Sequence, residues 1–334
     1  MIRRDDIESP IETAPARRPI VLYLDQNKWI DLARAAHAPE EHREDYAALE
    51  RLCLAVEAGQ VTIPLTASNF YETQKVNNFD LRTAIARTQV TLSGGRVFRG
   101  RRRRLEIEGA RVLADLYEKP WTEPDPDWVL SSLFFEAVAE AGTPALGLSF
   151  SQWDLERMAE EPQAALFDYL LARDEAIRQH GLMMFEAGVE QLRANVESRR
   201  ARQRDQSASM KRKIQSALIF LDDQDALIQA ADALDLDWRC FMDNNGTTAR
   251  RMLSETPTLV AQREMTLKLE GQRRAIHVND FCDMQNFTTV LPYADVIIAE
   301  KQFVNLARQA GMGSRFKARL ETRLSSLGEF LDQS

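Results

Sequence analysis

The chain has 334 residues, of which 44% are hydrophobic and 28% charged, as expected for a soluble globular protein with one large domain or two ordinary ones. Its formal net charge of -8 argues against a wholly basic nucleic-acid-binding module, although a local basic path is compatible with it. The cysteines are far apart, the histidines form no metal-ligand pattern, and no apolar run reaches about 18 residues, so no disulfide framework, zinc site or membrane span is indicated.

Residues 1–18 are charged and contain prolines, which predicts a flexible lead-in. This stretch lacks the apolar core of a signal peptide. We therefore expect a cytoplasmic protein with no membrane partner.

The next segment alternates between strand and helix patterns. "PIVLYLD" is typical of a buried parallel strand that ends at Asp25. "EEHREDYAALERLCLAVEAGQ" predicts an amphipathic helix ending at Gly59, "VTIPLT" a second strand, and "ASNFYETQK" a helix with Ser68 or Asn69 as its cap. Strand, helix, strand and helix in this order predict an α/β fold with a central parallel sheet.

From 76 to 271 helical spacing dominates and we find almost no convincing strand. The long helical stretch after Trp153 suggests two helices broken near Gly181. We therefore predict a large all-α insertion at 76–271 that divides the α/β core into 19–75 and 272–334. The insertion is expected to shape substrate access, to contact a partner protein, or to form a homo-oligomer.

After the insertion, the α/β pattern resumes. "RAIHV" is a candidate strand, "DFCDMQNFTTVLP" a helix, "ADVIIAE" a strand and "KQFVNLARQAG" a helix. The last stretch, "SRFKARLETRLSSLGEFLDQS", has helical spacing.

Acidic residues accompany these strands. Functional groups gather beyond the carboxyl ends of strands in an open parallel sheet, and Asp25 and Glu300 both end a predicted strand. Glu72 lies on the helix after the second strand, and Asp280 and Asp283 share one face of a later helix. So many acids in one place require a cation, and carboxylate oxygens favour Mg²⁺ or Mn²⁺.

Each acid also has a simpler interpretation. An aspartate or glutamate near the start of a helix stabilises that helix without any metal. Asp295 precedes the strand "VIIA" and should lie at the end of the sheet away from Glu300, so we interpret it as a junction residue between helix and strand. It is the conjunction of acids from distant segments that favours a metal site.

Three stretches, "IVLYLDQN", "VTIPLTASNFYE" and "NDFCDMQNFTTVLPYADVIIAEKQF", resemble the PIN-domain ribonucleases in order, spacing and local context. The resemblance covers roughly residues 19–75 and 272–311. It implies a three-layer α/β/α core around a parallel sheet and metal-dependent cleavage of RNA. It implies four acidic positions and one small polar position after the first, filled here by Asp25, Glu72, Asp283, Glu300 and, as the polar residue, Asn27.

Two departures from the family pattern stand out. The fourth acid of the family is usually an aspartate after a threonine, whereas this chain has Ala299 before Glu300. The missing hydroxyl affects the expected positioning of water. The helical insertion is also far larger than a minimal PIN domain carries.

A basic run, "GGRVFRGRRRR" at 94–104, could follow an RNA backbone while Phe98 stacks on a base. The arginines in question are Arg96, Arg99, Arg101, Arg102, Arg103 and Arg104. The following "LEIEGAR" supplies acids that would pair with them on an ordinary protein surface, and the sequence favours neither interpretation.

Together these patterns predict a PIN-like endoribonuclease that uses Mg²⁺ or Mn²⁺ to hydrolyse single-stranded RNA. Asp25, Glu72 and Asp283 would bind the metal, while Glu300 and Asp280 would complete the acidic pocket or position the attacking water. The alternative is a PIN-like scaffold or RNA-binding protein without catalytic activity. A metal-dependent phosphatase acting on a small substrate is a third hypothesis, which would leave the arginines without a role.

Overall fold

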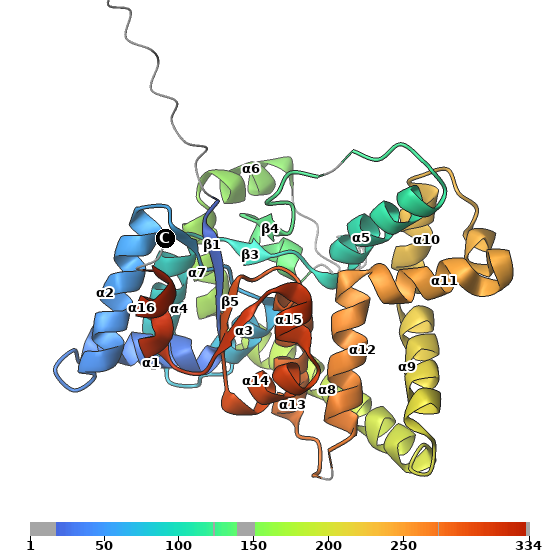
Figure 1. Ribbon diagram of the computed structural model, residues 1–334. Helices are drawn as coiled ribbons and strands as arrows, with labels where there is room; N and C mark the ends of the chain where they lie inside the picture. Colours follow the sequence, from blue (N-terminus) through green and yellow to red (C-terminus); the bar gives the residue numbers. More distant parts are fainter. Residues whose placement is uncertain (1–17, 123, 139–150, 273, 332–334) are drawn as a thin grey trace, which may run out of the picture.

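A sheet of four parallel strands lies at the centre of the computed structural model, which describes residues 18–122, 124–138, 151–272 and 274–331 (Figure 1). The strands occur in the order β2-β1-β5-β6. Their bounds are β1 (Ile20–Leu24), β2 (Val61–Thr62), β5 (Val296–Ile298) and β6 (Arg319–Glu321). The prediction of a mixed α/β fold with a parallel sheet is confirmed.

Strand β1 is central because both of its faces are apolar, as expected for a strand covered by helices on either side. It pairs with β2, which follows it closely in sequence, and with β5, which lies more than 270 residues later. In the second pairing Leu24 lies opposite Ile298. The carboxyl ends of β1 and β5 therefore lie side by side. The backbone N–H of Asp25 donates to the carbonyl of Ile298 at 3.0 Å.

Helices cover both faces of the sheet, each over its own apolar core. Leu22 and Leu24 belong to one core, and Val21 and Tyr23 to the other. The first face carries α1 (Gln26–His37), α2 (Arg43–Glu57), α4 (Phe79–Ser93) and α7 (Pro162–Leu171). The second carries α12 (Pro257–Glu270), α13 (Val278–Val290) and α14 (Lys301–Gln309), and α3 (Ala67–Gln74) lies at the sheet edge beside α13.

A third apolar core holds together a helical bundle beside the sheet (Figure 1). Its elements are α5 (Arg101–Leu116), α9 (Ala208–Asp222), α10 (Gln224–Asp232), the 3₁₀ helix η3 (Trp238–Met242), α11 (Asp243–Glu255) and one side of α12. The long helix α8 (Glu175–Arg202) connects it to α7. The segment 76–271 thus divides between two environments, because α4 and α7 pack in the core of the sheet and the later helices form the bundle.

Three expectations about local structure are wrong. The helical segment contains two short antiparallel strands, β3 (Val97–Phe98) and β4 (Leu130–Ser131). "RAIHV" forms no strand in its described residues, and Val278 instead begins α13. Helix α8 continues through Gly181. The break between helices instead falls at Ala172, which has a positive φ and ends α7.

The C-terminal stretch is also not wholly helical, because Arg319–Glu321 forms β6. This strand has only one buried residue, Leu320, between two charged neighbours. Three residues with this pattern do not differ in sequence from part of an amphipathic helix. The remaining elements are α6 (Gln152–Glu160), α15 (Met312–Phe316), α16 (Gly328–Leu331) and the 3₁₀ helices η1 (Phe134–Ala137) and η4 (Leu324–Leu327).

Among the residues that the structure describes, no helix combines the length and apolar character that a bilayer crossing requires.

Candidate functional site

Asp25 lies where β1 ends and caps the N-terminus of α1. Its Oδ1 accepts from the backbone N–H of Gln26 at 2.8 Å, and its Oδ2 accepts from that of Glu300 at 3.2 Å. The side chain is only 4% exposed. Burial raises the pKa of Asp25, although the two backbone hydrogen bonds oppose this effect. The carboxylate is thus fixed between the ends of β1 and β5.

Glu72 approaches the same edge from α3. A capping box between Thr66 and Asn69 fixes the start of this helix, and the Asn69 amide donates to Oε1 of Gln26 at 3.3 Å, which joins α3 to α1. The Oε2 atom of Glu72 is buried and has no hydrogen-bond partner among the residues that the structure describes. Burial, followed by the negative charge of Asp25, raises the pKa of Glu72 to about 8.

Asp283 comes from α13, which is joined to α3 by a buried hydrogen bond of 2.6 Å from the Thr66 hydroxyl to Oδ1 of Asn286. Burial raises the pKa of Asp283 to about 9, with further contributions from the charges of Asp25 and Glu72. Asp283 is therefore close enough to both acids for their charges to act on it. The phenol of Tyr23 has its pKa raised by burial and then by these same three carboxylates.

We call Asp25, Glu72 and Asp283 the acidic cluster. They belong to three elements far apart in sequence and interact electrostatically at the carboxyl edge of the sheet. Across the described ranges, no three or more histidine, cysteine, aspartate or glutamate side chains already have an arrangement that could hold a metal ion. The acids are therefore near one another, without converging on one point in this conformation.

Glu300 is an exposed residue beside the cluster and forms the N-cap of α14. With the exposed Asn27, it lines a cavity of about 450 Å³. The other walls of this cavity include four basic residues, which we call the basic rim: Lys28, Lys301, Arg308 and Arg323. An anion that approaches the outer side of the cluster would meet positive charge first.

Asp280 makes a different set of contacts from the cluster. Its carboxylate accepts two hydrogen bonds from the Arg274 guanidinium, at 2.7 and 2.6 Å, one from the backbone N–H of His277 at 2.7 Å and one from Gln302 at 3.0 Å. Burial alone would raise the pKa of Asp280, but these contacts hold it below its usual value. Asp280 thus fixes the start of α13.

Replacing Asp280 with alanine should lower the free energy of unfolding by about 2 kcal/mol, because a helix cap and a charged hydrogen-bonding partner are lost together. The loss should be largest near neutral pH and shrink in acid, since an acid with a lowered pKa stabilises the fold above its unfolded-state pKa and loses this contribution as it is protonated. Urea unfolding of wild type and variant at pH 7 and at pH 3.5 measures the loss of unfolding free energy and its decrease in acid. Equal losses at the two pH values would contradict this role.

Asp295 lies at the opposite end of β5, as the sequence predicts. It binds the Arg18 guanidinium at 3.1 and 2.7 Å and accepts from the backbone N–H of Val21 at 2.9 Å. Its carboxylate joins the start of β1 to β5 and has no part in the cluster.

The six arginines of the basic run all have acceptors within the protein. Five pair with carboxylates: Arg96 with Asp127, Arg99 with Glu136, Arg101 with Asp223, and Arg102 and Arg103 with Glu106. Arg104 is only 2% exposed and donates to the Arg99 carbonyl and to Thr258 and Thr289. Arg103, with 59% of its side chain exposed, is the most accessible of those in ion pairs.

Two groups at this edge were missed from the sequence. The first is the buried polar network beneath the cluster, in which the Oε1 atom of Gln26 accepts hydrogen bonds from the side chains of Asn69 and Gln89. The sequence signal for this network was a polar residue, Gln26, shortly after the first predicted strand. The second is Arg323 of the basic rim, which follows β6 at the same edge of the sheet as Asp25. Because β6 itself was not predicted, neither was the position of Arg323.

Comparisons with models of protein families, with curated proteins and with solved structures give no match to this chain.

Proposed function

We propose that this chain is a metal-dependent endoribonuclease with a PIN-like core, in which Asp25, Glu72 and Asp283 bind one Mg²⁺ or Mn²⁺. The observation that carries the proposal is the acidic cluster itself, and above all the buried Oε2 of Glu72, which has no partner. A buried carboxylate without a partner is costly, and a divalent cation removes this cost.

The chemistry of the donor set supports the same metals. All three ligands are carboxylates, and oxygen ligands favour hard cations. Asp25 is fixed by two backbone hydrogen bonds, whereas Glu72 and Asp283 lie on helices and would have to rotate their side chains to share an ion with it. When bound, the ion would activate water and stabilise negative charge on the phosphodiester.

The residues around the cluster have separate tasks in this proposal. The basic rim binds the phosphates on either side of the bond to be cleaved and orients the strand. Glu300, exposed at the mouth of the same cavity, accepts a proton from the attacking water. Asn27, which lines the same cavity, donates a hydrogen bond to a phosphate oxygen. The open cavity suits a single strand, which can place one phosphate against the cluster.

The test is cleavage of end-labelled single-stranded RNA in the presence of Mn²⁺. Wild type should cleave, and Asp25→Asn should be at least about 100-fold slower, because even outer-sphere partners of a metal are worth roughly 10- to 100-fold. Asp295→Asn, the same change at the other end of the sheet, should retain activity.

Equal cleavage by wild type and Asp25→Asn would contradict the proposed site. No cleavage by wild type, with Mn²⁺ bound, would favour the scaffold hypothesis.

A further inference from the structure

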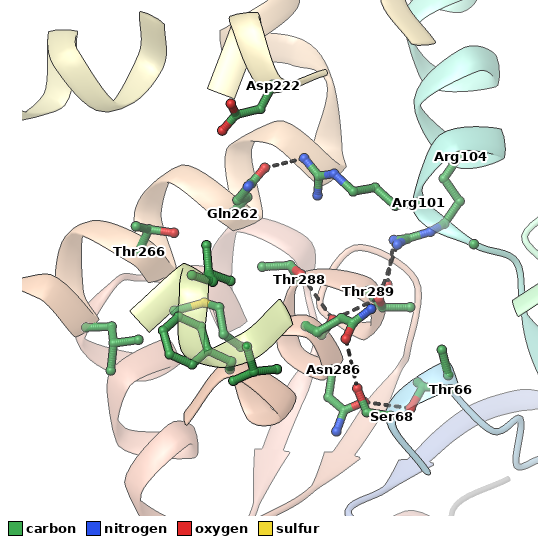
Figure 2. Close-up of a pocket in the computed structure, with 18 of the residues that line it drawn as sticks. Thr66, Ser68, Arg101, Arg104, Asp222, Gln262, Thr266, Asn286, Thr288 and Thr289 are labelled. Carbon is green, nitrogen blue, oxygen red and sulfur yellow. Dashed lines mark hydrogen bonds between the residues drawn. The ribbon is translucent and has the colours of Figure 1, made fainter. Parts of the chain in front are cut away.

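A second cavity of about 400 Å³ lies between the sheet and the helical bundle (Figure 2). Its walls come from α3, α5, α8, α9, α12 and α13. The acidic cluster does not line it, although α3 and α13 contribute to both places. The volume is within the range of pockets that bind small molecules, roughly 300–1,000 Å³. We call it the interdomain cavity.

Most of the wall is apolar. Its apolar residues include Phe185, Val189 and Leu192 of α8 and Phe281 and Met284 of α13. Phe185 is held in place by stacking on Tyr71, with 3.7 Å between ring centroids. A flat apolar ring would therefore find aromatic and thioether surface already in position.

The polar residues of the wall include three carboxamides whose NH₂ groups have no acceptor among the described residues. In the described structure, the side chain of Gln215 makes no hydrogen bond, and the NH₂ groups of Asn286 and Gln262 have no acceptor, although their oxygens do accept. Gln215 is 6% exposed and Asn286 1%. Figure 2 shows Gln262 and Asn286 toward different ends of the cavity. The NH₂ group of Asn286 is buried without an acceptor, whereas those of Gln215 and Gln262 are available to a ligand in the cavity, so a ligand with acceptors would be favoured here.

The arginines of the wall already have partners. Arg101 binds Asp223 at 2.7 Å and Arg199 pairs with Glu270. Burial, followed by the negative charge of Asp223, raises the pKa of Asp222, which favours its uncharged form. A charged ligand would have to compete with these pairs. A purely aliphatic ligand would leave the carboxamide donors without acceptors. The cavity thus favours an uncharged planar ring with several acceptors on its edge.

We propose that the interdomain cavity binds a nucleobase, with its ring against the apolar wall of α8 and α13 and its carbonyl and ring-nitrogen acceptors toward Gln215 and Gln262. The base can belong to a free nucleoside or to a bound RNA strand. Recognition is independent of the metal, since none of the acidic cluster lines the cavity.

Calorimetric titration of the full chain with adenosine, guanosine, cytidine and uridine, each separately, tests the proposal. At least one should bind saturably with a dissociation constant below about 1 mM. Leu218→Trp, which places a large ring in the cavity, should weaken binding at least about 10-fold. The matched change on the same helix, Leu221→Trp at a side chain 59% exposed, should change it less than about two-fold.

Gln215→Leu keeps the shape of the cavity and removes one donor, so it should also weaken binding about 10-fold. If Leu218→Trp does not fold, Gln215→Leu alone tests whether nucleosides bind in the interdomain cavity. Displacement of the nucleoside by a short oligoribonucleotide identifies a pocket for a base of an RNA strand, and the absence of displacement identifies a site for the free nucleoside.

No binding of any of the four nucleosides, or binding that neither variant weakens, would overturn the proposal. Asp25→Asn should bind nucleoside as wild type does even if it cleaves no RNA. Failure of this inference and failure of the proposed catalytic site are therefore distinguishable.

Discussion

Asp283→Asn is expected to abolish RNA cleavage and at the same time to stabilise the metal-free protein. Cleavage should fall at least about 100-fold, since a proposed metal ligand is removed. The free energy of unfolding at pH 7.5 should rise by about 1–3 kcal/mol, because the variant no longer has to bury this carboxylate beside Asp25 and Glu72. A loss of activity together with a gain of stability is typical of a residue selected for function.

The dependence of the protein's stability on pH has a definite sign. The pKa values of Glu72 and Asp283 are raised in the folded protein to about 8 and about 9, above their usual values near 4, so the folded state binds more protons than the unfolded state between these limits. Stability of the metal-free protein should therefore decrease as pH rises from about 5 to 9. The decrease should be smaller in Asp283→Asn and in wild type with saturating Mn²⁺.

Urea unfolding at several pH values, with EDTA or with Mn²⁺, measures these effects. The matched control is Asp295→Asn, which should leave the pH dependence between 5 and 9 as in wild type because its partners lie at the other end of the sheet. Stability of the metal-free protein that rises toward pH 9 would contradict the acidic cluster.

Arg104→Ala is expected to lower the free energy of unfolding by about 3 kcal/mol, because a buried charge network loses its cation. Glu108 is 2% exposed and accepts hydrogen bonds from the backbone N–H and the hydroxyl of Thr258. Arg104 donates to the same Thr258 hydroxyl. Without Arg104 this buried carboxylate loses the positive charge that shares Thr258 with it. Arg104 further joins α5 to α13 through two contacts to Thr289.

Arg103→Ala is the matched control on the neighbouring residue. Its side chain is 59% exposed and its ion pair with Glu106 lies on the surface, so the change should cost less than about 1 kcal/mol. Urea unfolding of both variants gives the comparison, and Arg104→Lys replaces Arg104→Ala if the latter does not fold. If Arg104→Ala were as stable as wild type but bound RNA more weakly, Arg104 would be a nucleic-acid contact and the structural role would be wrong.

The edge of the sheet that carries Asp25 and Glu300 was accessible to sequence reasoning because two apolar strands end there. Asp25 ends an apolar strand, and the strand that precedes Glu300 has the same continuous apolar character. The rule that parallel strands gather functional groups at one edge then brings these segments together without knowledge of the connection between them. The register of β1 with β5 places their ends at the same level.

What the sequence does not show is which acids already have partners. Asp280 and Asp283 are three residues apart on one helix, yet Asp280 binds Arg274 while Asp283 makes no ion pair in the described structure. The arginine run posed the same problem, since Arg101 pairs with Asp223 more than 100 residues away. Tertiary contacts of this kind are set by packing of distant segments, and local patterns carry no signal for them.

The most direct measurement is Mn²⁺ binding followed by electron paramagnetic resonance on the protein without RNA. The account predicts one saturable Mn²⁺ per chain in wild type and in Asp295→Asn. It also predicts that binding is lost, or at least about 10-fold weaker, in each of Asp25→Asn, Glu72→Gln and Asp283→Asn. If all three variants bound the ion as tightly as wild type, or if wild type bound none, the three carboxylates would not share a cation.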